Sequence, residues 1–172
     1  MDESDATDLR HLLDLREIQD LALRYARAAD RRDYALFEAV YTEDARLSGH
    51  RGDPDTTPPY FALEGRGVIV ASMRALDRFE STLHVVSNQL VEIDGDRAHG
   101  ETYCMAHHVY REGEVAMDHT MAIRYQDRMA RTNGRWRFQE RRLAIDWERH
   151  APLREDTRTA VLDPSAPGSR RG

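Results

Sequence analysis

The chain has 172 residues, a length that suits one domain with its own hydrophobic core. Its formal net charge of −6, with acidic and basic residues interspersed, provides no basic surface of the kind that nucleic-acid binding requires. The N-terminus is acidic where a signal peptide would be basic, and no apolar run approaches the ~20 residues of a membrane span. A lone cysteine, Cys104, cannot form an internal disulfide. We therefore expect a soluble cytoplasmic protein with neither a nucleic-acid nor a membrane partner.

The first half of the chain has helical patterns. Over residues 8–30, apolar residues recur at the spacing of an α-helix and form one stripe. Asp33 is placed to cap a second, shorter helix, which an extended piece at 45–48 follows. Residues 49–60 are rich in Gly, Pro, Asp and Thr and predict a loop. A third helix is expected over 67–79.

Beyond Glu80 the pattern changes to extended runs, which turn signals separate at IDGDRA, REGE and TNGR. This pattern predicts four long antiparallel strands in a meander. Helices followed by such a meander indicate an α+β domain, in which the helices pack on the concave face of a curled sheet and leave a cavity. We expect the domain to span residues 1–150, and residues 151–172, which lack periodicity, to form a flexible tail.

Strand alternation predicts which polar side chains face the cavity. The third extended run places His119 and Met121 on its apolar face. The second run places Cys104 and His108 on a face of small side chains, and the first places His84 beside aliphatic residues. A lone histidine in such a place is more often a satisfied core residue than a catalyst, but three together favour a functional role for at least one. None has the HxH or HExxH spacing of a metal site, so no metal is expected.

Two polar residues of the first helix lie on or near its apolar stripe. Tyr25 is at the centre of the stripe, and Asp30 is near its edge. Asp30 could be a solvated residue or a cap, and the spacing alone slightly favours this structural role. It could also be a carboxylate that enters the cavity and orients an imidazole, raising the basicity of that ring.

The segment LREIQDLALRYARAADRRDYALFEAVYTEDARL, followed later by STLHVVSN, resembles the SnoaL-like branch of the NTF2-like superfamily over most of residues 9–150. The resemblance implies an NTF2-like cone, a curved antiparallel sheet packed on N-terminal helices around a pocket. Within the branch, the chain resembles scytalone dehydratase, hexachlorocyclohexane dehydrochlorinase and bile acid 7α-dehydratase. These enzymes share an Asp at the end of the first helix and a His on the first long strand, which correspond to Asp30 and His84.

Further matches to these enzymes are less complete. Tyr25 matches a tyrosine five residues before the Asp of the bile acid enzyme, and His108 best matches a second pocket histidine of scytalone dehydratase. The tyrosine pair that holds a catalytic water in scytalone dehydratase is not matched. Ile145 stands where the bile acid enzyme has an arginine, which leaves Arg142 as a substitute.

The resemblance implies a cofactor-independent, dehydratase-like lyase that acts on a small hydrophobic cyclic or polyketide-like substrate. His84 would be the base, Asp30 would orient it, and Tyr25 would donate a hydrogen bond to the developing enolate. The expected substrate-binding residues are His108, His119, Arg142, Met121 and Cys104. An isomerase or cyclase with the same relay, and a non-catalytic module that binds a small ligand, remain alternatives.

The outer face of the predicted sheet carries apolar residues. Tyr103, Met105 and Val109 alternate with the cavity-facing residues of the second strand. An apolar face of this kind implies a covering partner. We expect a homodimer or homotrimer built on it, as relatives in the superfamily commonly show.

Overall fold

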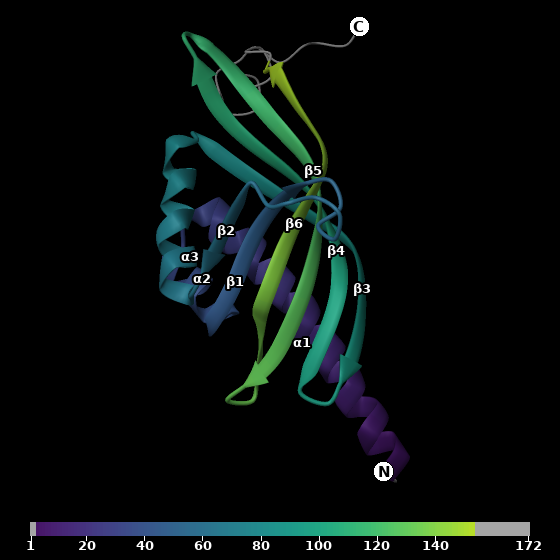
Figure 1. Ribbon diagram of the computed structural model, residues 1–172. Coiled ribbons are helices and arrows are strands. Elements are labelled where there is room, and N and C mark those ends of the chain that lie inside the picture. Colours follow the sequence, from purple (N-terminus) through teal and green to yellow (C-terminus); the bar gives the residue numbers. More distant parts are fainter. Residues whose placement is uncertain (1–2, 154–172) are drawn as a thin grey trace, which may run out of the picture.

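A long first helix lies across one face of a curved six-stranded sheet in the computed structural model, which describes residues 3–153 (Figure 1). The elements in chain order are α1 (Glu3–Arg31), α2 (Tyr34–Val40), β1 (Tyr41–Arg51), β2 (Phe61–Glu64), α3 (Arg66–Ser72), the 3₁₀-helix η1 (Met73–Arg78), β3 (Ser81–Asp94), β4 (Arg97–Glu112), β5 (Val115–Thr132) and β6 (Arg135–Pro152). The strand order is β2-β1-β6-β5-β4-β3. The α+β, NTF2-like cone predicted from the sequence is confirmed.

Helix α1 forms because its apolar residues share one face, and Ile18, Ala22 and Tyr25 of that face are buried against the sheet. It begins at Glu3, before the predicted start at residue 8. Its first turns are exposed and project beyond the sheet (Figure 1). Exposed turns need no apolar stripe, so the stripe in the sequence does not show where the helix begins. Among residues 3–153, no helix is both long enough and apolar enough to cross a membrane.

The segment between the helices and the meander departs most from the sequence pattern. Asp33 caps α2 as predicted, since its Oδ1 accepts a hydrogen bond from the backbone N–H of Leu36 at 3.0 Å. Strand β1 is much longer than the predicted extended piece and runs parallel to β6, and the short strand β2 pairs with it. The predicted third helix is α3 only in its first half, because the chain tightens to the 3₁₀-helix η1 from Met73.

The four-stranded antiparallel meander, β3 to β6, is as predicted. Strand β6 continues through Ala151 to Pro152, where β5 pairs with it, so the ordered domain extends past residue 150. The rest of the predicted tail, from residue 154, lies outside the described residues.

An ion pair lies in the middle of the core. The guanidinium of Arg141 is fully buried and donates two hydrogen bonds of 2.8 Å to the carboxylate of Asp127. The rings of Tyr25, Tyr125 and Phe138 surround it, with centroids 4.2, 4.1 and 3.9 Å from its central carbon. Burial opposes the charge on Arg141, but Asp127 outweighs it and the pKa of the guanidinium is raised. The cation therefore persists in the core, where both its charge and its flat faces are matched.

Because a buried cation without a partner is costly, Asp127→Asn should lower the free energy of unfolding by about 3–5 kcal/mol. The matched control is Asp55→Asn, which removes an exposed ion pair with Arg142 and should cost less than about 1 kcal/mol. Urea denaturation of both variants measures the difference, and equal losses would contradict the role given to the buried pair.

Candidate active site

The carboxylate of Asp30 and the ring of His84 are held together where α1 ends beside β3. Asp30 Oδ1 lies 2.7 Å from His84 Nδ1, and Asp30 Oδ2 accepts a hydrogen bond of 3.0 Å from the backbone N–H of His84. Both side chains are largely buried, with 17% and 7% of their surfaces exposed. An ionised carboxylate can only accept, so Nδ1 carries the ring proton and Nε2 is left with a lone pair.

The hydrogen bonds of Asp30 also set its charge state. Burial by itself would raise the pKa of this carboxyl, but the ring and backbone N–H groups of His84 together outweigh burial and lower it. Asp30 therefore stays ionised around neutral pH and stabilises a positive charge on His84 when one forms.

Arg32, which the sequence analysis did not single out, fixes the end of α1 next to this pair. It has a left-handed backbone conformation, with φ of 56°. Its guanidinium donates to the carbonyl of Ala29 at 2.5 Å, to the hydroxyl of Thr82 at 2.7 Å and to the carbonyl of Leu76 at 2.8 Å. These bonds tie α1, β3 and η1 together two residues from Asp30, and no short motif in the sequence announces them.

His84 faces a mostly apolar cavity of about 270 Å³ between the sheet and the segment from β2 to η1. The cavity is lined by Tyr25, Ala29, Leu47, Arg51, Tyr60, Phe61, Met73, Ala75, Leu76, Arg78, Phe79, His84, His108, His119, Met121, Ile123, Tyr125, Leu143, Ile145 and Glu148. Asp30 is not part of the lining, so it acts on the cavity only through His84. Such a volume and lining suit a small, largely apolar ligand with one or two polar groups.

Three imidazoles stand in sequence along the cavity wall. The ring centroid of His108 is 5.5 Å from that of His84 and 6.1 Å from that of His119. Burial, and then the neighbouring His84 and His119, lower the pKa of His108 to about 3. Its Nε2 is buried without a hydrogen-bond partner among the described residues, and Phe79 packs on its ring at 4.6 Å. His108 is therefore neutral in the folded protein and has hydrogen-bonding capacity to spare.

His119 forms a second imidazole–carboxylate pair at the cavity wall. Its Nε2 lies 3.0 Å from Oε2 of Glu148, and the other oxygen of Glu148 accepts a hydrogen bond from Arg51. The hydrogen bonds from Arg51 and His119 lower the pKa of Glu148. The sequence singled out His119 but not Glu148, because the strand pairing that joins them is invisible in the linear chain.

The cavity contains some of the predicted substrate-binding residues and excludes others. Met121 lines it together with His108 and His119, as does Tyr25. Cys104 is buried in the core and interacts with Tyr125, whose larger ring supplies the lining instead. Arg142 is a correction: it binds Asp55 and Gln126 on the outer face, because adjacent strand residues alternate and Arg141 takes the inner side.

The predicted loop at 49–60 is in part strand, since β1 runs to Arg51, and the segment from Gly49 to Phe61 contributes aromatic rings and no acid to the cavity. His50 is held by Ser48 at 3.0 Å and by the carbonyl of Thr57 at 2.9 Å, away from the lining. Tyr60 and Phe61 do line the cavity, and they lie over Gly49. A Cβ at residue 49 would be 2.3 Å from the Phe61 ring, so only glycine allows this close approach.

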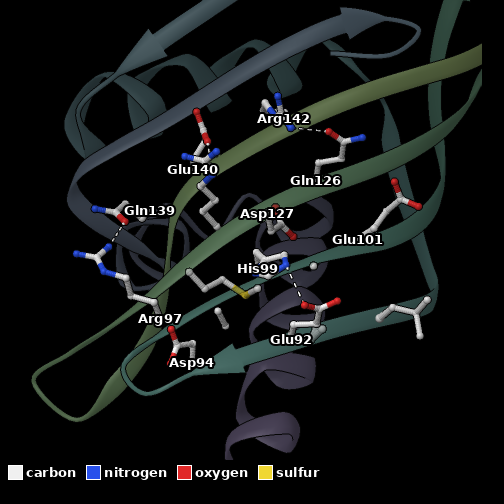
Figure 2. Close-up of a pocket in the computed structure, with 16 residues that line it drawn as sticks. Glu92, Asp94, Arg97, His99, Glu101, Gln126, Asp127, Gln139, Glu140 and Arg142 are labelled. Carbon is white, nitrogen blue, oxygen red and sulfur yellow. Dashed lines mark hydrogen bonds and ion pairs between the residues drawn. The ribbon is translucent and has the colours of Figure 1, made fainter. Parts of the chain in front are cut away.

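A larger depression, of about 960 Å³, lies on the other face of the sheet and is lined by many charged side chains together with apolar ones such as Leu90 and Met129 (Figure 2). Its polar side chains largely satisfy one another: His99 pairs with Glu92, Arg97 with Gln139, and Arg142 with Gln126 (Figure 2). We therefore place the candidate active site in the inner cavity, where imidazole nitrogens face apolar space.

Residues 10–142 match the SnoaL-like domain, and the chain belongs to that family. No curated protein matches the chain in sequence. Among solved structures it is similar to the "Putative Scytalone Dehydratase" of Novosphingobium aromaticivorans DSM 12444, with 21% identity, a TM-score of 0.72, and 84% of this chain and 91% of that chain covered.

Two further structures extend the comparison. The hexachlorocyclohexane dehydrochlorinase LinA-type3 of Novosphingobium barchaimii LL02 is 18% identical, with a TM-score of 0.69 and 86% of this chain and 95% of that chain covered. A protein of unknown function from Mycobacterium tuberculosis is 25% identical, with a TM-score of 0.65 and coverages of 78% of this chain and 77% of that chain. The resemblance to the SnoaL-like branch is thus confirmed, and the neighbours include both enzymes and proteins without a known activity.

The low pKa of His108 makes the stability of the fold depend on pH. The ordinary pKa of histidine is 6.5, and that of His108 in the folded chain is about 3. At pH values between these two, the unfolded chain binds a proton at His108 and the folded chain does not. Stability therefore falls as the pH decreases through this window. Between pH 7 and pH 5, the wild type should lose about 2 kcal/mol more of its unfolding free energy than His108→Gln. Urea denaturation at the two pH values tests this, and parallel losses would contradict it.

Proposed function

We propose that the chain is a cofactor-independent lyase that removes a proton and a β leaving group, most simply water, from a small hydrophobic cyclic or polyketide-like substrate. The observation that carries the proposal is the 2.7 Å contact between Asp30 Oδ1 and His84 Nδ1 beside an apolar cavity. A carboxylate in this place fixes the tautomer of the imidazole and stabilises the imidazolium that forms when the ring takes a proton.

In the proposed reaction, His84 Nε2 takes a proton from the carbon next to a substrate carbonyl. The electron pair of that C–H bond forms the enolate, and its collapse breaks the bond from the β carbon to the hydroxyl oxygen. The imidazolium, stabilised by Asp30, returns the proton to the departing hydroxyl as general acid, so that water leaves. No external oxidant or reductant is required.

Two groups support the negative charge of the enolate oxygen. Burial, opposed in part by Arg141, raises the pKa of Tyr25, so its hydroxyl stays protonated and can donate. His108 is neutral and retains an N–H that can donate to the same oxygen. Donors fixed in a dry cavity before the charge develops stabilise it more than water does.

The printed names of two neighbours support an elimination. One neighbour is named as a dehydratase and another as a dehydrochlorinase, and both reactions remove a proton and a leaving group. Because the same relay can move a proton without expelling a group, an isomerase or cyclase is the second candidate. A non-catalytic binding module is disfavoured by the buried carboxylate–imidazole pair, which such a module does not need.

The central test is turnover of a panel of cyclic β-hydroxy ketones, with loss of water followed by mass spectrometry. His84→Ala should lower the rate by roughly 10²- to 10⁴-fold, Asp30→Asn by somewhat less and Tyr25→Phe by less again. His99→Ala on the outer face is the control and should turn over like the wild type. Equal conversion by His84→Ala and wild type would reject His84 as the base. Binding without conversion across the panel would favour the binding module.

We also propose that the chain self-associates through its outer sheet face. Strand register places Val85, Met105, Ala122 and Trp147 in one row across β3, β4, β5 and β6. The row is apolar throughout, and Val85 and Trp147 at its ends are exposed, as is Tyr103 beside it. A continuous apolar row on a sheet face is the feature that a second copy would cover.

Sedimentation at micromolar concentration should therefore give the mass of a homodimer or homotrimer, and Val85→Lys should shift it to the monomer. Leu90→Lys is the matched control, because Leu90 is 81% exposed on the outer side of the same strand but outside the row. A monomer mass for the wild type would refute the proposal.

A further inference from the structure

Three residues that can bind a metal converge on the inner face of β5 and β6. His119 on β5 lies directly opposite His150 on β6, and Glu148 precedes His150 by two residues and so lies on the same face. One potential ligand atom from each of the three lies within 4.8 Å of the other two. The sheet fixes the backbone positions of all three residues, so the cluster does not rely on a mobile loop.

The spacing within the cluster fits ligands of one ion. His119 Nε2 and Glu148 Oε2 are 3.0 Å apart. Two ligand atoms that each bind an ion at about 2.0–2.1 Å are separated by roughly 3 Å, so a cation can take the place of the hydrogen bond between these two atoms. The His150 ring stacks on that of His119 at 4.1 Å, and its exposure allows it to rotate toward the same point.

Neighbouring groups occupy the other polar atoms of two of these ligand residues. The hydroxyl of Tyr110 lies 2.9 Å from His150 Nδ1, which leaves Nε2 of that ring for an ion. Arg51 holds one oxygen of Glu148 and leaves the other toward His119. Partners of this kind, on the side of the ligand away from the ion, are typical of metal sites.

We propose that His119, Glu148 and His150 bind one divalent cation of the zinc class. Two imidazole nitrogens and one carboxylate oxygen suit Zn²⁺ or Co²⁺ and not Ca²⁺ or Mg²⁺, which prefer oxygen ligands. His119 and Glu148 also line the cavity, so a fourth position on the ion would be open to an oxygen of a bound molecule. The proposed relay of Asp30 and His84 does not require this ion, so the two proposals are independent.

Calorimetric titration of chelator-treated protein with Zn²⁺ should show one saturable site per chain. His150→Gln should weaken the affinity at least 10-fold, and Tyr110→Phe by about 10-fold through the loss of ligand orientation. His99→Gln is the matched control, because His99 pairs with Glu92 across two strands of the outer face and should leave the affinity unchanged. Titration with Co²⁺ should add visible absorption bands that His150→Gln lacks.

Circular dichroism checks that each variant is folded, and Glu148→Gln replaces His150→Gln if the latter is not. Equal affinity of the wild type and the folded ligand variant, or absence of a saturable Zn²⁺ site in the wild type, would overturn the proposal. Since the readout is binding, His84→Ala should keep the site, and a failure of the elimination chemistry would not count against it.

Discussion

The buried pair of Arg141 and Asp127 constrains the core of this protein. A cation with no exposed surface requires a counter-charge and flat, polarisable neighbours, and β5 and α1 supply them as Asp127, Tyr125 and Tyr25. Two of these rings also line the cavity. This part of the wall of the candidate site is therefore held by a buried ion pair that does not itself line the cavity.

A second constraint sets the chemistry of the cavity. Asp30 accepts from both the ring and the backbone of His84, so the position and the tautomer of the imidazole are set together. Arg32 holds the end of α1 against η1 and β3, which keeps the carboxylate in reach. The cavity thus presents a base with a free nitrogen to a mostly apolar space, and its charge partner stays behind the ring, away from the ligand.

The three histidines of the cavity wall differ in their partners and in their charge. His84 has an ionised partner, His108 is neutral without one, and His119 is hydrogen-bonded to Glu148 near Arg51 and Tyr60. Three similar rings thereby acquire different properties from their surroundings alone. The SnoaL-like fold allows these differences because it brings inward-facing residues of neighbouring strands close together, while each histidine keeps a different set of contacts.

The sequence by itself determined the elements whose patterns are local: the stripe of α1, the cap at Asp33, the turns of the meander and the inward faces of β4 and β5. On β3 the alternation holds only to Val86, because a register shift before Gln89 turns Leu90 to the outer face. The family resemblance added the pairing of Asp30 with His84. Only the tertiary structure decided that β1 runs parallel to β6, that Arg141 and not Arg142 faces inward, and that Glu148 and His150 meet His119. These features depend on which strands pair and in which register. The hydrophobic pattern of a strand shows which of its residues face inward, but not which strand lies beside it.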